Sequence, residues 1–200
     1  ALMKVIGLKE SDLPEILIHD FRKNGYLPEA LLNFLALLGW NPGENREHMT
    51  TAEMVQLFTV QGIGKSNAKF DRAKLLSFNT EACGAAPVAR LVPAMRDYLA
   101  VNPDSPLNGA DDATLAKLLE MKKGFRLLRE VDETCRFLFI TDDQIVHDPS
   151  AIEKVLKKQD NQGANVLRDL LPLLTNIADW HAAVLEAAIQ QYCDSKQLPL

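Results

Sequence analysis

The chain has 200 residues, enough for one large or two small domains, and its 47% hydrophobic and 24% charged residues are typical of a globular protein. No apolar run approaches the roughly 20 residues that a membrane-spanning helix needs, and the N-terminus lacks the basic stretch and apolar segment of a secretory signal. The net charge of −5 counts against a small basic DNA-binding module, so neither a membrane nor DNA is an expected partner.

The charge is unevenly distributed along the chain. Residues 1–100 carry eleven basic and eleven acidic side chains, whereas residues 101–200 carry eleven basic and sixteen acidic ones. The second half therefore supplies the whole negative excess. A local cluster of lysines and arginines is then more informative about a polyanionic partner than the net charge of the chain.

Hydrophobic periodicity and turn residues predict a mainly helical chain. Pro28 suits a first helical turn, and Leu31, Phe34 and Leu35 recur at helical spacing. Thr51 is the predicted N-cap of the helix that follows. The predicted helices cover residues 27–38, 51–58, 67–79, 87–101, 112–121, 125–139, 148–158, 161–174 and 177–193. A change in the sequence pattern near residues 83–87 predicts a domain boundary there.

Nothing in the sequence supports a catalytic or metal site. The segment Gly62-Ile63-Gly64-Lys65-Ser66 ends like a phosphate-binding loop, but Thr59 stands where that motif requires its first glycine. The four histidines are scattered without zinc-like spacing. The three cysteines are far apart and odd in number, which favours free thiols in a reducing cytosol. We therefore expect no catalytic residue, no metal ligand and no cofactor.

Three groups of basic residues are candidates for contacts with a phosphate backbone. Lys122, Arg126 and Arg129 follow i, i+4, i+7 spacing, which predicts one shared helix face with Lys123 and Arg136 nearby. The other two groups are Lys65, Lys69, Arg72 and Lys74, and Lys154, Lys157 and Lys158. The alternative for each group is an ordinary solvated surface.

One stretch is more specific than any of these patterns. Residues 25–40 read Gly-Tyr-Leu-Pro-Glu-Ala-Leu-Leu-Asn-Phe-Leu-Ala-Leu-Leu-Gly-Trp, after an Asp-Phe-Arg at residues 20–22. The stretch resembles the segment that follows the catalytic domain in bacterial-type glutamyl-tRNA synthetases. A second block follows the same family's pattern with Lys65-Ser66, Ala68, Phe70-Asp71, Lys74-Leu75-Leu76 and Asn79, although Ser77 stands where the family usually has tryptophan. A third, weaker block is Leu128-Arg129-Glu130-Val131 to Phe137-Leu138-Phe139, with Gly124 where many members have arginine.

The resemblance implies a mainly α fold, a helical bundle with two domains. Residues 1–84 would form a small stem-contact domain, and residues 85–200 an all-helical anticodon-binding domain that is truncated at its C-terminal end. The family's HIGH and KMSKS signatures do not occur in the chain. We therefore expect a fragment that is inactive alone, although its parent enzyme would use ATP and Mg²⁺ to attach glutamate to tRNA in the cytoplasm.

The implied function is binding of the stem and anticodon arm of glutamate-accepting tRNA, with glutamine-accepting tRNA as an open possibility. The predicted tRNA-binding residues are Lys65, Ser66, Lys69, Arg72 and Lys74 for the stem, and Lys122, Lys123, Arg126 and Arg129 for the anticodon arm. An alternative is a helical module that binds a protein, such as a partner of the parent enzyme, and has no tRNA affinity of its own. A lysine-specific class I synthetase fits less well, because its match to residues 25–40 is weaker.

Overall fold

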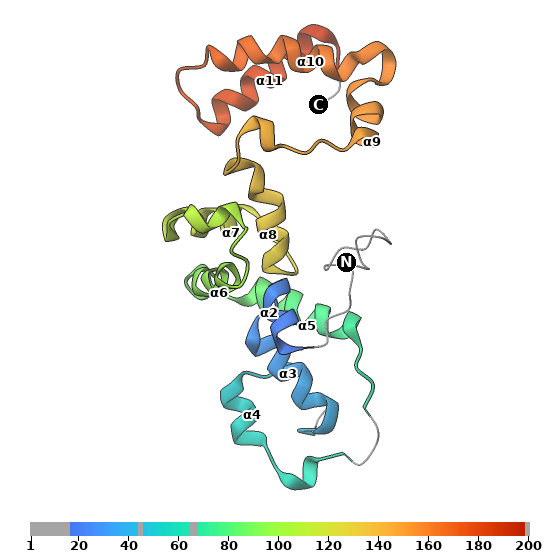
Figure 1. Cartoon of the computed structure of the whole chain (residues 1–200), viewed down its shortest axis with the longest axis vertical. Coiled ribbons are helices and arrows are strands. Elements are labelled where there is room, and N and C mark those ends of the chain that lie inside the picture. Colours follow the sequence, from blue (N-terminus) through green and yellow to red (C-terminus); the bar gives the residue numbers. More distant parts are fainter. Residues whose placement is uncertain (1–16, 44–45, 65–67, 199–200) are drawn as a thin grey trace. The chain divides into compact units, whose positions relative to one another are not determined.

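The structure is a computed structural model that describes residues 17–43, 46–64 and 68–198. These residues form helices and connecting loops without any β-strand, apart from an isolated bridge between Trp40 and Ile63, which confirms the predicted mainly α fold (Figure 1). The chain divides into two compact units between Asp142 and Asp143. Within the described part of the chain, no helix has both the length and the apolar composition needed to cross a membrane.

The first part of unit 1 packs around an aromatic core. Its helices are α2 (Ile18–Asn24), α3 (Pro28–Gly39), α4 (Thr51–Leu57), the short 3-10 helix η2 (Val60–Gly62) and α5 (Arg72–Ala85). Helices α3 and α5 pack against each other and bury Phe34 and Phe78, whose ring centroids lie 6.1 Å apart. Phe21 from α2 and Leu75 from α5 complete this cluster.

The predicted helix at residues 27–38 is confirmed as α3, with Pro28 in its first turn. Its buried face contains Ala30, Leu31 and Phe34, whereas Leu35 is exposed. The predicted cap at Thr51 is wrong. Thr50 is the N-cap of α4, because its hydroxyl accepts from the backbone N–H of Glu53 at 3.2 Å while the Glu53 carboxylate accepts from the backbone N–H of Thr50 at 2.8 Å.

The helix predicted at residues 67–79 begins later and ends later than expected. Asp71 is its N-cap, since one carboxylate oxygen accepts from the backbone N–H groups of Ala73 at 2.9 Å and Lys74 at 3.1 Å. Helix α5 then continues through Cys83 to Ala85. This extension carries α5 from the aromatic core into a second, larger buried cluster.

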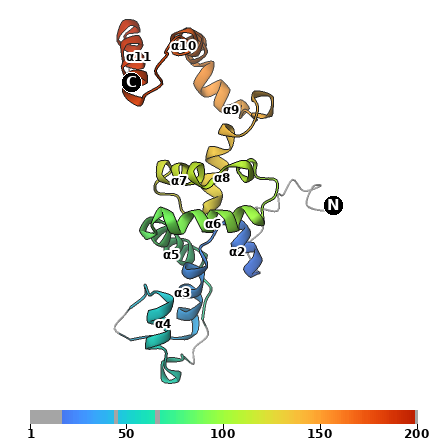
Figure 2. The same ribbon diagram turned by 90° about the vertical axis from the view of Figure 1, so that its left-hand side faces the viewer.

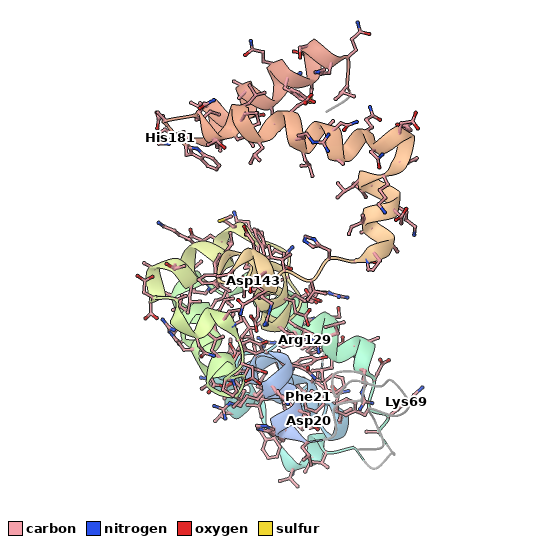
Figure 3. All side chains as sticks on the ribbon, turned by 45° about the horizontal axis from the view of Figure 1, so that its top comes forward. Asp20, Phe21, Lys69, Arg129, Asp143 and His181 are labelled. Carbon is pink, nitrogen blue, oxygen red and sulfur yellow. The ribbon has the colours of Figure 1, made fainter. Side chains whose placement is uncertain are left out.

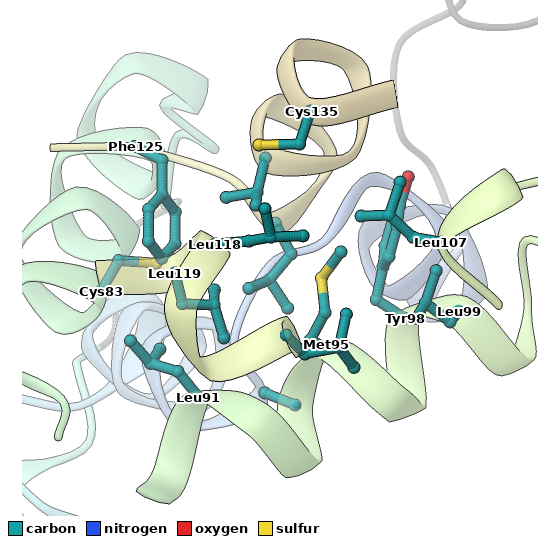
Figure 4. Close-up of a cluster of buried hydrophobic side chains, with 14 of the residues drawn as sticks. Cys83, Leu91, Met95, Tyr98, Leu99, Leu107, Leu118, Leu119, Phe125 and Cys135 are labelled. Atoms are coloured by element: carbon teal, nitrogen blue, oxygen red, sulfur yellow. The ribbon is translucent and has the colours of Figure 1, made fainter. Parts of the chain in front are cut away.

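The second part of unit 1 consists of helices that pack side by side (Figure 2). They are α6 (Val88–Ala100), η3 (Pro106–Gly109), α7 (Asp112–Met121), α8 (Leu128–Cys135) and η4 (Arg136–Leu138), and the boundary between the two units falls within η5 (Asp142–Gln144). The cluster between them includes the fully buried Met95 and Leu107 (Figure 4). Val131 is fully buried in the same cluster. Leu27 and Ala30 of the first part belong to the same cluster. The boundary predicted at residues 84/85 stays a prediction about the family's domain organisation.

A buried carboxylate ties α6, η3 and α8 together. Asp132 on α8 accepts hydrogen bonds from the hydroxyls of Tyr98 at 2.9 Å and Ser105 at 2.8 Å. Both partners are themselves buried. Burial, reinforced by the charge of Asp132, raises the pKa of Tyr98 far above its ordinary value, so the phenol remains a hydrogen-bond donor.

Unit 2 contains α9 (Pro149–Ala151), the π-helical turn η6 (Ile152–Leu156), α10 (Lys158–Thr175) and α11 (Ala182–Lys196). Tyr192 and Cys193 are its buried side chains among the described residues. Residues 159–161 have positive φ angles of 50°, 56° and 63°, which separate η6 from the regular part of α10. The helix predicted at residues 148–158 is confirmed over Pro149–Leu156 with Asp148 as its N-cap, and its second part is π-helical.

The turn between α2 and α3 generates a prediction about stability. Gly25 has φ +84°, and a Cβ atom at this position would lie 2.8 Å from the backbone nitrogens of Leu128 and Arg129. We expect Gly25→Ala to lower the free energy of unfolding by about 2 kcal/mol or more, because a left-handed conformation and a backbone clash are combined. Urea unfolding followed by circular dichroism measures this loss.

The matched control is Gly84→Ala on α5. No atom lies within 4 Å of a Cβ built at Gly84. This substitution should leave stability unchanged or raise it by up to about 1 kcal/mol, because alanine restricts the unfolded chain. Equal stability of the Gly25→Ala variant and the native chain would contradict the close contact between the turn and α8.

Candidate nucleic-acid interface

The basic residues predicted to contact a tRNA stem lie before and within the first turn of α5. Lys65 and Ser66 are outside the described residues. Lys69 lies in the exposed segment that precedes α5 (Figure 3). The guanidinium of Arg72 lies 5.5 Å from the ring centroid of Phe70.

Lys74 is differently placed, because its ammonium has an acidic partner. The Nζ atom lies 2.5 Å from Oε1 of Glu47 and 5.7 Å from the ring centroid of Phe78. The hydrogen bond from Lys74 lowers the pKa of Glu47 below its ordinary value. A phosphate contact by Lys74 would compete with this ion pair. Exposed ion pairs are weak, so such competition is possible.

The predicted shared face of Lys122, Arg126 and Arg129 does not exist. Helix α7 ends at Met121, Gly124 adopts φ +83°, and α8 begins only at Leu128. The three cations therefore lie at the end of one helix, in a turn and in the first turn of another helix. The spacing rule failed because it assumes a continuous helix, whereas the chain reverses at a left-handed glycine.

The turn at residues 122–127 is nevertheless a well-defined structure. Phe125 and Leu127 point into the protein and are 6% exposed each. Arg126, which lies between them, and Lys123, which precedes them, are exposed. Alternation of buried and exposed positions fixes the turn to the core and leaves its charged side chains in solvent.

Arg126 and Arg129 are engaged in contacts within the protein. Arg126 donates from Nε to Oε1 of Glu130 at 2.9 Å, and its backbone N–H donates to Oε2 of the same residue at 2.8 Å. Burial alone would raise the pKa of Glu130, but the hydrogen bonds from Arg126 outweigh it and lower that pKa. Arg129 donates from Nη1 to Oδ1 of Asn24 at 2.6 Å and lies 3.6 Å from Glu133. Its position therefore links α8 to the end of α2 (Figure 3).

Lys122 and Lys123 form the most available cationic pair of the second group. Lys123 is exposed and Lys122 is half-buried. Within the described ranges, neither ammonium has an ion-pair partner, and the same is true of Lys69. In the third group, on unit 2, Lys157 is paired with Glu153 at 2.6 Å. Among the residues that the structure describes, no group of three or more His, Cys, Asp or Glu side chains could hold a metal ion.

Sequence reasoning missed the structural importance of Asn79. Its side chain is fully buried on α5 and bonds to the start of α3 and to the turn at residues 122–127. A signal was present, because Asn79 follows Leu75 by four residues on a predicted apolar face. A polar side chain at such a position must have buried partners, but the sequence does not identify them.

Two family models match successive parts of the chain. A family model described as an anticodon binding domain matches residues 90–200, and one described as the catalytic domain of class I tRNA synthetases (E and Q) matches residues 12–77. A glutamate–tRNA ligase of Afipia carboxidovorans is 36% identical over 189 residues, which cover 92% of this chain and 39% of that protein. The chain therefore spans about two fifths of the length of this curated relative.

Two solved structures share the fold. A glutamate tRNA ligase from Elizabethkingia meningosepticum, crystallised with its amino acid, superposes with a TM-score of 0.68 over 88% of this chain and 33% of its own. Glutamate-tRNA synthetase from Elizabethkingia anophelis superposes with a TM-score of 0.63 over 88% of this chain and 32% of its own. Both are 24% identical to this chain, so these two likenesses bear on the fold alone.

The contrast between Arg129 and Lys123 can be tested by unfolding. We expect Arg129→Ala to lower the free energy of unfolding by about 1–2 kcal/mol, because Asn24 loses a charge-assisted hydrogen bond. Lys123→Ala should change it by less than about 0.5 kcal/mol, because an exposed side chain without a partner is removed. Urea denaturation of both variants measures the difference, and equal midpoints would contradict the internal role of Arg129.

Proposed function

This chain belongs to the anticodon-binding-domain family that glutamate–tRNA ligases carry, and from this membership we propose that it binds the stem and anticodon arm of tRNA. The observation that carries the proposal is the pair Lys122 and Lys123 on a fixed turn within the family-matched region, without acidic partners among the described residues. Such ammonium groups can neutralise phosphates and release condensed counterions.

The proposal assigns a graded set of contacts. Lys69, Lys122 and Lys123 are the primary phosphate contacts, because binding RNA would not require them to leave an acidic partner. Arg72, Lys74 and Arg126 are secondary contacts, because each already interacts with a ring or a carboxylate. Lys65 and Ser66 remain candidates from the resemblance alone. Arg129 is a candidate whose first role is to join α8 to α2.

The wider activity is also a proposal. We infer that the protein containing this region attaches glutamate to tRNA with ATP and Mg²⁺, as the resemblance and the curated relative suggest. Catalysis is not assigned to any described residue. The three free cysteines fit a cytoplasmic location, where thiols stay reduced.

The choice of tRNA belongs to the proposal as well. One turn before the weaker resemblance block, Gly124 stands where many family members have arginine, and its φ of +83° would strain an arginine there. The cations of this turn must therefore come from neighbouring positions. We propose that the protein accepts glutamate tRNA and that glutamine tRNA is a second candidate, so both are used in the test.

A salt series tests tRNA binding. Affinity should fall steeply between 50 and 200 mM salt, by about tenfold or more for each few phosphate contacts, because counterions are released on binding. The Lys122→Glu/Lys123→Glu double variant should bind about tenfold more weakly and show a shallower slope of log affinity against log salt. Fluorescence anisotropy with labelled glutamate and glutamine tRNAs measures both quantities.

A control with the same change of charge as the single variant Lys123→Glu is Lys117→Glu, on the exposed side of α7. It should retain most of the affinity, because Lys117 lies outside the proposed interface. Salt-independent binding, or an unchanged slope in the double variant, would refute the phosphate role of Lys122 and Lys123. Absence of tRNA binding at low salt would favour the alternative of a protein-interaction module.

A further inference from the structure

Asn79 occupies a junction between three parts of unit 1. Its side chain is 0% exposed on α5. Its Oδ1 atom accepts from the backbone N–H of Leu27 at 2.7 Å, at the start of α3. Its Nδ2 atom donates to the backbone carbonyl of Arg126 at 2.5 Å and lies 3.6 Å from the sulfur of Cys83. One amide therefore bonds segments that are 52 and 47 residues away in the chain.

Both backbone polar groups of Arg126, its N–H and its carbonyl, are hydrogen-bonded. Its N–H donates to the Glu130 carboxylate at 2.8 Å, and its carbonyl accepts from Asn79, with the Cys83 thiol 3.8 Å away as a weaker donor. The side chains of Phe125 and Leu127 are buried on either side. These contacts leave the turn little freedom to change conformation.

The start of α8 is held by the turn between α2 and α3. The backbone N–H of Leu128 donates to the carbonyl of Gly25 at 3.1 Å, and Arg129 donates to Asn24 at 2.6 Å. Leu27, which donates to Asn79, follows directly in the turn between α2 and α3. The turn at residues 122–127 is therefore held to α5 through Arg126, and the first residues of α8, which follow it directly, are held to the α2–α3 turn.

We propose that Asn79 is a positioning residue for RNA binding: its bond to the Arg126 carbonyl holds the turn that presents Lys122 and Lys123 to phosphates. This inference rests on the proposed tRNA-binding function. An exposed lysine loses less conformational freedom on binding when its backbone is already fixed, so a rigid turn contributes affinity through preorganisation. Asn79 makes this contribution without touching the RNA.

The isosteric substitution Asn79→Asp separates the two bonds of the amide. A carboxylate can still accept from Leu27, but it cannot donate to Arg126 when ionised, and that carbonyl loses its stronger donor. We expect tRNA affinity to fall about threefold to tenfold, the range that one lost hydrogen bond corresponds to. Cys83→Ala removes the weaker donor and should cause a smaller loss in the same direction.

A double-mutant cycle distinguishes positioning from general loss of stability. Each variant is combined with Lys123→Ala on the turn and, separately, with Lys69→Ala before α5. The effects of Asn79→Asp and Lys123→Ala should be less than multiplicative, because both act through one contact. The effects of Asn79→Asp and Lys69→Ala should multiply. Leu75→Ala, a fully buried control on α5 in the aromatic core, should destabilise the protein without coupling to Lys123.

Coupling of Asn79 with Lys123 but not with Lys69 supports the inference. Multiplicative effects in both cycles, or an equal coupling of Leu75→Ala with Lys123→Ala, overturn it. If Asn79→Asp does not fold, the Cys83→Ala cycle decides in the same way. A native chain that shows no salt-dependent tRNA binding refutes the proposed function instead, so the two failures differ.

Discussion

The backbone of Gly25 approaches the start of α8 so closely that no side chain fits between them. This approach allows the Leu128 N–H to reach the Gly25 carbonyl and brings Arg129 to Asn24. Asn79 accepts the hydrogen bond from the N–H of Leu27, and both residues are 0% exposed. Because an unpaired buried polar group is costly, the turn, α5 and α8 must assemble together. The large core around Met95 and Val131 then includes Leu27 and Ala30 from the first segment of the chain.

The sequence predicted elements well where local chemistry determines them. Helix α7 was predicted at its observed bounds, because acidic capping residues and apolar spacing agree there. The start of α5 was predicted too early. Lys69 and Phe70 suit a helix by composition, but the helix begins only after its N-cap, Asp71. The cap at Thr50 was missed in favour of its identical neighbour, and only the position of Glu53 three residues beyond distinguishes them.

The candidate site was harder to predict than the fold. Spacing placed Lys122, Arg126 and Arg129 on one face, but the glycine between them takes a left-handed conformation. The sequence also could not tell which cations have partners within the protein, since Glu47 lies 27 residues from Lys74 and Asn24 lies 105 residues from Arg129. These contacts depend on tertiary packing. The residue types of the site were predictable from the sequence, whereas their availability required the structure.

The pattern of ion pairs shows how an acidic chain can still carry local cationic points. Arg22, Arg90 and Arg96 each lie within 2.7 Å of a carboxylate, and these pairs join helices α2, α3, α6 and α7. Acidic residues thus neutralise many of the cations that stabilise the fold. Among the described residues of unit 1, Lys69, Lys117, Lys122 and Lys123 lack such partners, and of these Lys122 and Lys123 are neighbours on one turn. A polyanion would be attracted to those few points rather than to the molecule as a whole, so a net charge of −5 is compatible with local phosphate binding.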